Sequence, residues 1–246
     1  MATRLAGLGA EVTAAGRNPD RLEALVSSLP GHGHRIAVAD LGEADGPDRL
    51  VAQVDRVDCL VANAALPATG RLTDLTETQV SRMLRINLES PIHLSQALLP
   101  GMIERGEGKI VMIGSLAGKA GNPRSSVYNA TKFGLRGFAF GLRADLVGTG
   151  VGVTVVAPGF VRDAGMFAEA GVRLPRGLGT TTSERVAEAV VEAIQSDRAE
   201  IAVAPPLQRT IAHIGLVSPT LSYRVQSGKT GQRTAEGLAS GQTDKR

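Results

Sequence analysis

The sequence has little of several residue types that mark particular functions. Of its 246 residues one is cysteine, none is tryptophan, and only 3% are aromatic. A single cysteine excludes an intrachain disulfide and fits a reducing compartment, so we expect a cytoplasmic protein. Cys59 lies in an apolar run, which favours a small core residue over a nucleophile. The scarcity of aromatic side chains argues against a stacking platform for nucleic-acid bases.

Long apolar runs and metal-ligand spacings are also missing from the sequence. No stretch approaches the ~18 apolar residues of a membrane span, and we expect neither a span nor a signal peptide. The four histidines have no ligand spacing, so we expect no metal site. Lys and Arg number 27 against 24 Asp and Glu, a net charge of +3. These charges are scattered rather than striped, so we expect no nucleic-acid surface.

Helix and strand patterns alternate along the chain. Strands are expected at residues 11–15, 35–40, 59–62, 109–114, 151–157 and 200–204, and helices at 19–29, 48–53, 76–99, 126–147, 184–195 and 207–217. This alternation predicts an α/β fold, a doubly wound parallel sheet between two helix layers. We assign residues 1–206 to that domain. Residues 207–246 are expected to form a helix and then a disordered tail, because Gly, Ser, Thr, Gln and charged residues dominate from residue 227.

One stretch carries the clearest chemistry. Tyr128 and Lys132 are four residues apart, and on a helix this spacing places both side chains on one face. A phenol is a poor base at neutral pH, but a nearby ammonium favours its ionised form and lowers its pKa. Ser115 ends the strand expected upstream, where an open α/β sheet places its chemistry. The alternative is an ordinary surface pair, because Tyr-x-x-x-Lys occurs often by chance.

The order Asn63-Ala-Ala65, Asn87, Ser115, Tyr128-x-x-x-Lys132 and Pro158-Gly159 resembles that of the short-chain dehydrogenase/reductase family. The resemblance extends over roughly residues 5–204. It implies a Rossmann-like, three-layer fold. It also implies NAD(P)-dependent hydride transfer between a nicotinamide and a small-molecule carbonyl or secondary alcohol.

The resemblance also implies roles for four catalytic residues. Tyr128 would be the general acid in reduction and the general base in oxidation. Lys132 would lower the pKa of Tyr128 and bond the nicotinamide ribose. Ser115 would donate to the substrate oxygen. Asn87 would help to hold a water that links Lys132 to solvent. The helix of Asn87 is expected to break near Ser90 and Pro91, because a proline inside a helix frees a backbone carbonyl upstream and a kink there could expose it.

Further positions match cofactor-binding residues of the family. Asn63 and Ala64 would lie beside the adenosine ribose, although Ala65 stands where the family usually has glycine. The turn at Pro158 and Gly159 would pass over the nicotinamide, with the backbone of Val161 holding its carboxamide. Asp163 stands where the family often has threonine.

Two cofactor assignments stay open to a structural alternative. Asp40 and Leu41 resemble the family's adenine-contacting pair, but Asp40 could equally cap the turn after its strand. No acid occupies residues 14–16, where NAD-preferring sites usually place one, and Arg17 follows directly. An arginine can pair with a 2′-phosphate, so NADP is favoured and NAD remains possible. The alternative for Arg17 is a turn cap before the next helix.

The start of the chain departs from the family pattern. A strand and a Gly-rich turn should precede the first helix, and neither is found before the helix expected within residues 1–10. Gly7 and Gly9 do not replace that turn, because a strand rather than a helix follows them. The sheet is therefore expected to lack its first central strand. Either the start codon is assigned too late, or the chain is truncated and binds cofactor poorly. The alternative function is then a non-catalytic scaffold or binding protein.

One region is expected to cover the bound substrate, and another to form a subunit interface. Residues 164–182 would form a substrate flap, with Met166, Phe167, Val172 and Leu174 as candidate lid residues. The apolar residues of the helix at 126–147 go more than halfway round it. This breadth indicates burial against a partner subunit as well as the sheet. We therefore expect a homodimer or homotetramer.

Overall fold

The computed structural model describes residues 1–67 and 69–242. Its parallel strands form two sheets. One contains β1 (Thr13–Gly16) and β2 (Arg35–Val38), and the other has the order β3 (Cys59–Ala62), β4 (Gly108–Ile113), β5 (Val151–Pro158), β6 (Glu200–Val203). Within the described residues, β1 pairs only with β2, and β3 only with β4. The six strands that the sequence predicts are therefore present, in two separate sheets.

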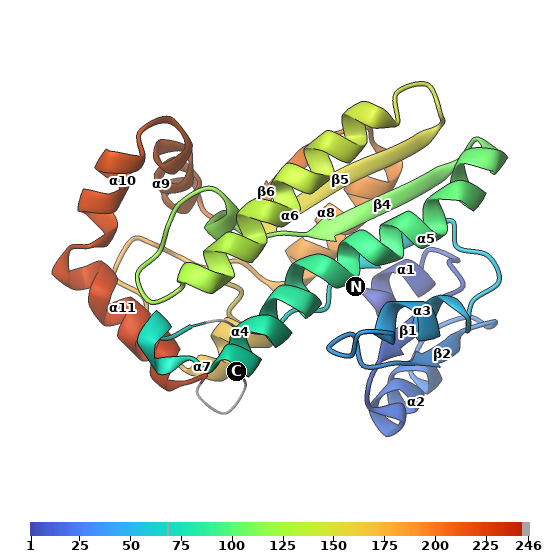
Figure 1. The fold of residues 1–246 in the computed structure, drawn as a ribbon, viewed down its shortest axis with the longest axis horizontal. Helices are drawn as coiled ribbons and strands as arrows, with labels where there is room; N and C mark the ends of the chain where they lie inside the picture. Colours follow the sequence, from blue (N-terminus) through green and yellow to red (C-terminus); the bar gives the residue numbers. More distant parts are fainter. Residues whose placement is uncertain (68, 243–246) are drawn as a thin grey trace.

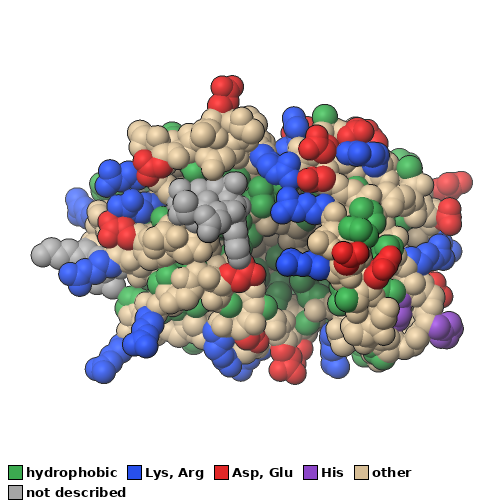
Figure 2. Space-filling view, turned by 90° about the horizontal axis from the view of Figure 1, so that it is seen from below, with side chains coloured by type: hydrophobic (Ala, Val, Ile, Leu, Met, Phe, Trp, Pro, Cys, Tyr) green, Lys and Arg blue, Asp and Glu red, His purple; other side chains and the backbone are tan. Residues whose placement is uncertain are grey.

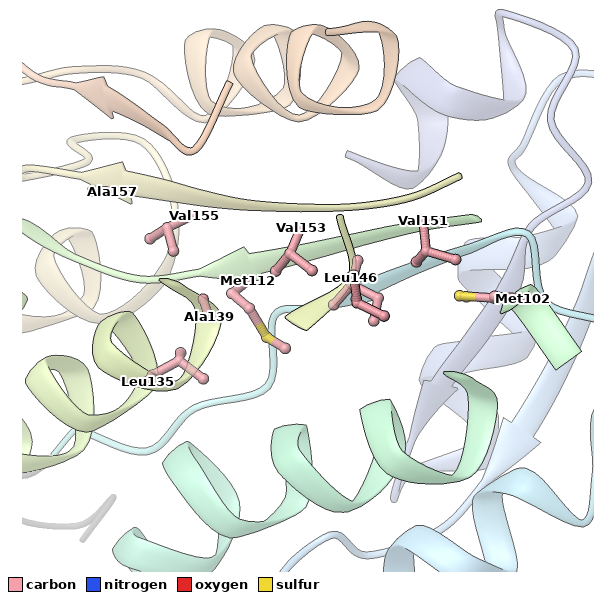
Figure 3. Close-up of a cluster of buried hydrophobic side chains, with 10 residues drawn as sticks. Met102, Met112, Leu135, Ala139, Leu146, Val151, Val153, Val155 and Ala157 are labelled. Carbon is pink, nitrogen blue, oxygen red and sulfur yellow. The ribbon is translucent and has the colours of Figure 1, made fainter. Parts of the chain in front are cut away.

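Helices cover both faces of the four-stranded sheet, as a doubly wound fold requires (Figure 1). On one face lie α5 (Ser90–Arg105) and α6 (Ser126–Asp145), and on the other α8 (Ser183–Gln195) and the short α1 (Ala2–Ala6). Alternate residues of β4 point to opposite faces, so Ile110 and Met112 join the α5–α6 core and Val111 the α8 core. Figure 3 shows the first of these cores, with Met112 between the sheet and Leu135 of α6.

The two-stranded sheet carries its own helices and is attached through α5. It holds α2 (Pro19–Ser27), and α3 (Gly46–Val51) packs on α5. Ser90 donates a 2.8 Å hydrogen bond to the carbonyl of Leu41, and Arg85 donates one of 3.1 Å to that of Gly42.

Figure 2 shows one face of the molecule, seen from below. This face is hollowed near its middle, with hydrophobic side chains in the hollow and acidic and basic side chains interspersed around it.

The helix expected at 76–99 begins where the sequence predicts and is interrupted just before Pro91. Thr76 and Gln79 form a capping box at the start of α4 (Glu77–Leu84). The helix then continues through a π-helical segment, Arg85–Glu89, into α5. Pro91 is the second residue of α5, and because it has no N–H, a carbonyl upstream of it lacks its helical partner. The irregularity expected at the proline is therefore the π segment, which contains Asn87.

The C-terminal region differs most from the expectation. The helix predicted at 207–217 is present as α9 (Pro206–Val217), but the expected disordered tail forms α10 (Pro219–Gln226) and α11 (Lys229–Ser240) instead. Residues 243–246 lie outside the described residues. The expectation of disorder rested on the polar composition of the tail, yet α11 buries Ala235 and Ala239 against other elements. Within the described residues, no helix is both long and apolar enough to cross a bilayer.

Candidate active site

Ser115 and Tyr128 meet beyond the carboxyl end of β4. Ser115 follows that strand and caps the 3-10 turn Leu116–Gly118, accepting a 3.1 Å hydrogen bond from the N–H of Ala117. Tyr128 lies in the first turn of α6, half-buried, and its hydroxyl hydrogen-bonds to the Ser115 side chain. Burial raises the pKa of Tyr128, and the Ser115 bond only partly opposes this. The expectation of a lowered tyrosine pKa is therefore not met in the ligand-free protein.

Lys132 lies one helical turn beyond Tyr128 on the same face of α6. Its Nζ is 5.7 Å from the centre of the Tyr128 ring and donates a 2.9 Å hydrogen bond to the carbonyl of Ile113. The side chain is almost fully buried, and this lowers the pKa of Lys132 to about 8. An ammonium has three donors, so two remain without an acceptor among the described residues. Such donors suit the hydroxyls of a bound molecule.

Asn87 is fully buried in the π segment, and among the described residues its side chain bonds to Leu66 and Thr131 rather than to Lys132. Its side chain accepts a 2.7 Å hydrogen bond from the N–H of Leu66 and donates one of 2.9 Å to the Leu66 carbonyl. Its Nδ2 is also 3.5 Å from Thr131 Oγ1, on α6. Asn87 therefore ties the loop after β3 to the helix of Tyr128. π-Helical segments are frequent at functional sites.

Asp40 and Arg17 come together at the carboxyl ends of β2 and β1. Asp40 accepts a 2.8 Å hydrogen bond from the N–H of Gly42 and pairs with Arg82 at 2.7 Å. Burial acts to raise the pKa of Asp40, but the bonds from Arg82 and Gly42, with the charge of Arg17, lower it. Asp40 does cap its turn, as the structural alternative stated. Arg17 is exposed and has no ion-pair partner among the described residues.

The remaining cofactor candidates lie at the same edge of the four-stranded sheet. Asn63 and Ala64 follow β3 and are exposed. Pro158 ends β5, the N–H of Gly159 donates to the carbonyl of Val203, and Val161 forms a bridge with Thr181. Asp163 instead accepts hydrogen bonds from the N–H and the hydroxyl of Ser183, and the backbone bond lowers its pKa. The N-cap of α8 is Thr182, whose hydroxyl accepts a hydrogen bond from the N–H of Arg185.

Sequence reasoning missed two buried amides that support the site. Asn129 donates to the carbonyls of Ala117 and Ala120 and so fixes the loop that carries Ser115. Gln208 of α9 donates to the carbonyls of Leu178 and Gly179. Asn129 could have been suspected, because it is a polar residue on a helix with apolar neighbours. Nothing local marks Gln208, since its partners are about 30 residues away in sequence.

Comparison with known proteins places this arrangement in a family. The sequence profile described as short chain dehydrogenase matches residues 1–173. The chain belongs to the short-chain dehydrogenase family. This is a family of oxidoreductases, and the two-layer helix cover over parallel sheets is the fold of its solved members.

The chain is similar in sequence to relatives that are named as reductases. The chain is 37% identical over 177 residues to ketoacyl reductase HetN of Nostoc sp., covering 70% of this chain and 62% of the relative, less than two thirds of its length. It is 38% identical over 204 residues to sulfoacetaldehyde reductase of Chromohalobacter salexigens, covering 76% of this chain and 79% of the relative.

Solved structures of the family are also similar. The serine dehydrogenase of Escherichia coli has a TM-score of 0.70 at 30% identity, over 83% of this chain and 90% of that one. A metagenomic short-chain oxidoreductase in complex with NADP has a TM-score of 0.67 at 28% identity, over the same shares.

The low pKa of Lys132 gives a stability prediction. In the unfolded chain a lysine titrates near ~10.4, so below pH ~8 both states carry the proton and the buried charge costs its full penalty. Between pH ~8 and ~10.4 the native state releases its proton first, so stability rises with pH. We expect Lys132→Met to stabilise the protein at pH 7 by up to about 3 kcal/mol, with the gain shrinking above pH ~8.

Chemical denaturation at several pH values measures this gain. The matched control is Lys132→Arg, which keeps the charge and should give no gain at any pH. A Lys132→Met protein no more stable than wild type at pH 7 would contradict the assigned penalty.

Proposed function

We propose that this protein is a nicotinamide-dependent oxidoreductase that interconverts a carbonyl and a secondary alcohol, with Tyr128 as general acid and base. The observation that carries the proposal is the arrangement of Ser115, Tyr128 and Lys132, with one hydroxyl pair and one buried ammonium at the end of β4. The relatives' names, ketoacyl reductase and sulfoacetaldehyde reductase, support carbonyl reduction.

Each residue has a role that follows from its surroundings. Because burial raises the pKa of Tyr128, its phenol keeps the proton at neutral pH and can donate it to a substrate oxygen. Ser115 donates a second hydrogen bond to that oxygen and stabilises the charge that develops there. The Lys132 ammonium favours the phenolate left after donation, and its free donors lead the replacement proton toward solvent. Asn87 holds the adjoining loop in place.

The polar groups at this edge fit a nicotinamide cofactor, which supplies or accepts the hydride when bound. The free donors of Lys132 would hold the ribose hydroxyls beside the nicotinamide. Exposed Asn63 and Ala64 would lie beside the adenosine ribose, and Pro158, Gly159 and Val161 beside the nicotinamide. Asp40 and Leu41 would contact the adenine. Arg17 is exposed and has no ion-pair partner in the part of the chain that the structure describes, so we propose that it holds a 2′-phosphate and that NADP is preferred.

We also propose that the cofactor-binding form contains a parallel strand between β1 and β3, leading into a Gly-rich turn. Both facing edges are unpaired in the described residues. The four residues of β3 are each only half-buried, whereas those of β4 are largely inaccessible. An unpaired inner edge with partly exposed apolar residues is unusual for parallel strands, which are normally covered. A strand there would place backbone N–H groups for a pyrophosphate.

Binding of NADPH and NADH, followed by fluorescence, tests these proposals. The 246-residue chain is compared with a version extended at its N-terminus by a strand and a Gly-rich turn. We expect the extended version to bind NADPH, and more tightly than NADH. If neither version binds either nucleotide, the oxidoreductase proposal fails. If the 246-residue chain binds as well as the extended one, the added strand is unnecessary and that proposal fails.

We further propose a homodimer or homotetramer with α6 at an interface. Phe133 of α6 is 41% exposed, although α6 otherwise buries its apolar face in the core. We expect Phe133→Glu to reduce the mass measured by light scattering to that of a smaller assembly. An unchanged mass, or a wild-type protein that is already a monomer, would contradict this.

A further inference from the structure

Helix α11 and the residues just beyond it contact three segments that follow the carboxyl ends of β3, β4 and β5, the sheet edge at which Ser115 lies. Gln242, just beyond the helix, accepts a 2.7 Å hydrogen bond from Thr69 Oγ1 in the segment after β3. Its Nε2 donates a 2.8 Å bond to the carbonyl of Met166, in α7 (Gly165–Ala170). Glu236 of α11 pairs at 2.6 Å with Arg124, which lies in the loop between Ser115 and Tyr128. Figure 1 shows α11 beside α7.

These contacts are built into the fold rather than resting on its surface. Gln242 is 3% exposed and Thr69 8%, and a buried amide that makes both hydrogen bonds is costly to displace. The backbone of α11 and of the residue after it also lies very close to the segment at residues 170–172. A Cβ added at Gly241 would lie 2.6 Å from the carbonyl oxygen of Ala170, and one at Gly237 would lie 3.1 Å from Val172. Glycine is thus required for α11 to lie on this segment.

The segment under α11 is short and only partly buried. None of the residues of α7 is buried, and no side chain caps the helix. Gly165 and Gly171, at its two ends, have φ angles of +72° and +64°, in the left-handed region that favours glycine. Backbone of this kind can serve as a hinge at each end of a moving segment. The contacts of α7 with α11, together with the Phe160–Phe167 ring pair, 4.9 Å apart, therefore contribute to its position.

We propose that α11 is a clasp that holds α7 closed over the substrate site, and that Gln242 is its positioning residue. As a statement about substrate, this rests on the proposed function. The clasp joins α7 to the loop that Asn87 fixes and to the loop that leads into Tyr128, so closure and the catalytic loops are coupled. When the clasp opens, the competent state is less populated, and the apparent affinity for substrate falls by that fraction.

Hydrogen exchange of the backbone amides tests the clasp without any catalytic assay. We compare Gln242→Ala with Gln232→Ala, which alters an exposed glutamine of α11 whose side chain, among the described residues, bonds to the carbonyl of Ser227. A second variant, Gly241→Ala, pushes α11 away from Ala170 and leaves both amide partners intact. We expect Gln242→Ala and Gly241→Ala to exchange at least about tenfold faster over residues 165–171, with the core strands unchanged. Gln232→Ala should match wild type.

Unchanged exchange over α7 in both clasp variants would overturn the proposal, whether or not the protein is an oxidoreductase. In the cofactor-binding form, the same variants should raise KM for a carbonyl substrate about tenfold while cofactor affinity stays the same. Faster exchange with an unchanged KM would overturn the role in substrate binding. Absence of turnover in the wild type would instead count against the proposed function, and the exchange result would still decide the clasp.

Discussion

Tyr128→Phe is expected to lower turnover by at least about 10³-fold and to leave the fold intact. General acid–base catalysis by a positioned side chain contributes roughly 10²–10⁴-fold, and no other phenol is close enough to substitute. The ring of Tyr128 packs against the small cluster of Met83 and Val127, and phenylalanine keeps that packing. Only the hydrogen bond to Ser115 is lost, which costs about 1 kcal/mol of stability.

The chain itself supplies a matched control for this variant. Its other tyrosine, Tyr223, lies on α10 and is 69% exposed, so Tyr223→Phe should keep full turnover. Steady-state kinetics with the cofactor-binding form, together with NADPH binding, separate a chemical effect from a binding effect. Tyr128→Phe should bind NADPH normally. Turnover within a factor of ~3 of wild type would remove Tyr128 from its proposed role.

The sequence predicts the parts of this site that depend on local pattern. The six strands and the helix of Tyr128 follow from runs of apolar residues, because burial on both faces leaves a continuous signal. The Ser115, Tyr128 and Lys132 positions follow from one strand end and one helical turn. The capping box of Thr76 and Gln79 is equally local, since all of its partners lie within four residues.

Features that depend on distant partners could not be predicted. The side chain of Asn87 is held by hydrogen bonds to the backbone of Leu66, 21 residues away, and that of Gln242 by a hydrogen bond from Thr69, 173 residues away. The pKa of Tyr128 moved opposite to the expectation, because its largest cause is burial, which the spacing of Tyr128 and Lys132 does not reveal. The helix predicted at 207–217 is present as α9, but α10 and α11 were missed, because they are stabilised by packing on other elements and propensity alone argues against them.

Glu200→Gln is expected to destabilise the protein by about 3–5 kcal/mol, the largest effect on folding that we predict. Glu200 begins β6 and bonds two cations, Lys119 Nζ at 2.6 Å and Arg136 Nε at 2.9 Å. The side chain of Lys119 is only 4% exposed. A neutral glutamine would leave that ammonium buried without a counter-charge. Scanning calorimetry should record a midpoint lower by about 10 °C for a domain of this size.

An exposed ion pair with the same N–O distance provides the control for this variant. Glu192 and Arg198 are also 2.6 Å apart, but their side chains are 44% and 60% exposed, so Glu192→Gln should change stability very little. Adding Lys119→Met to Glu200→Gln removes the stranded charge and should restore much of the loss. Lys119 is four residues after Ser115, so the single variant should also loosen the loop that positions the serine. If Glu200→Gln costs no more than Glu192→Gln, the buried charges do not hold that loop, and Asn129 alone must fix it through Ala117 and Ala120.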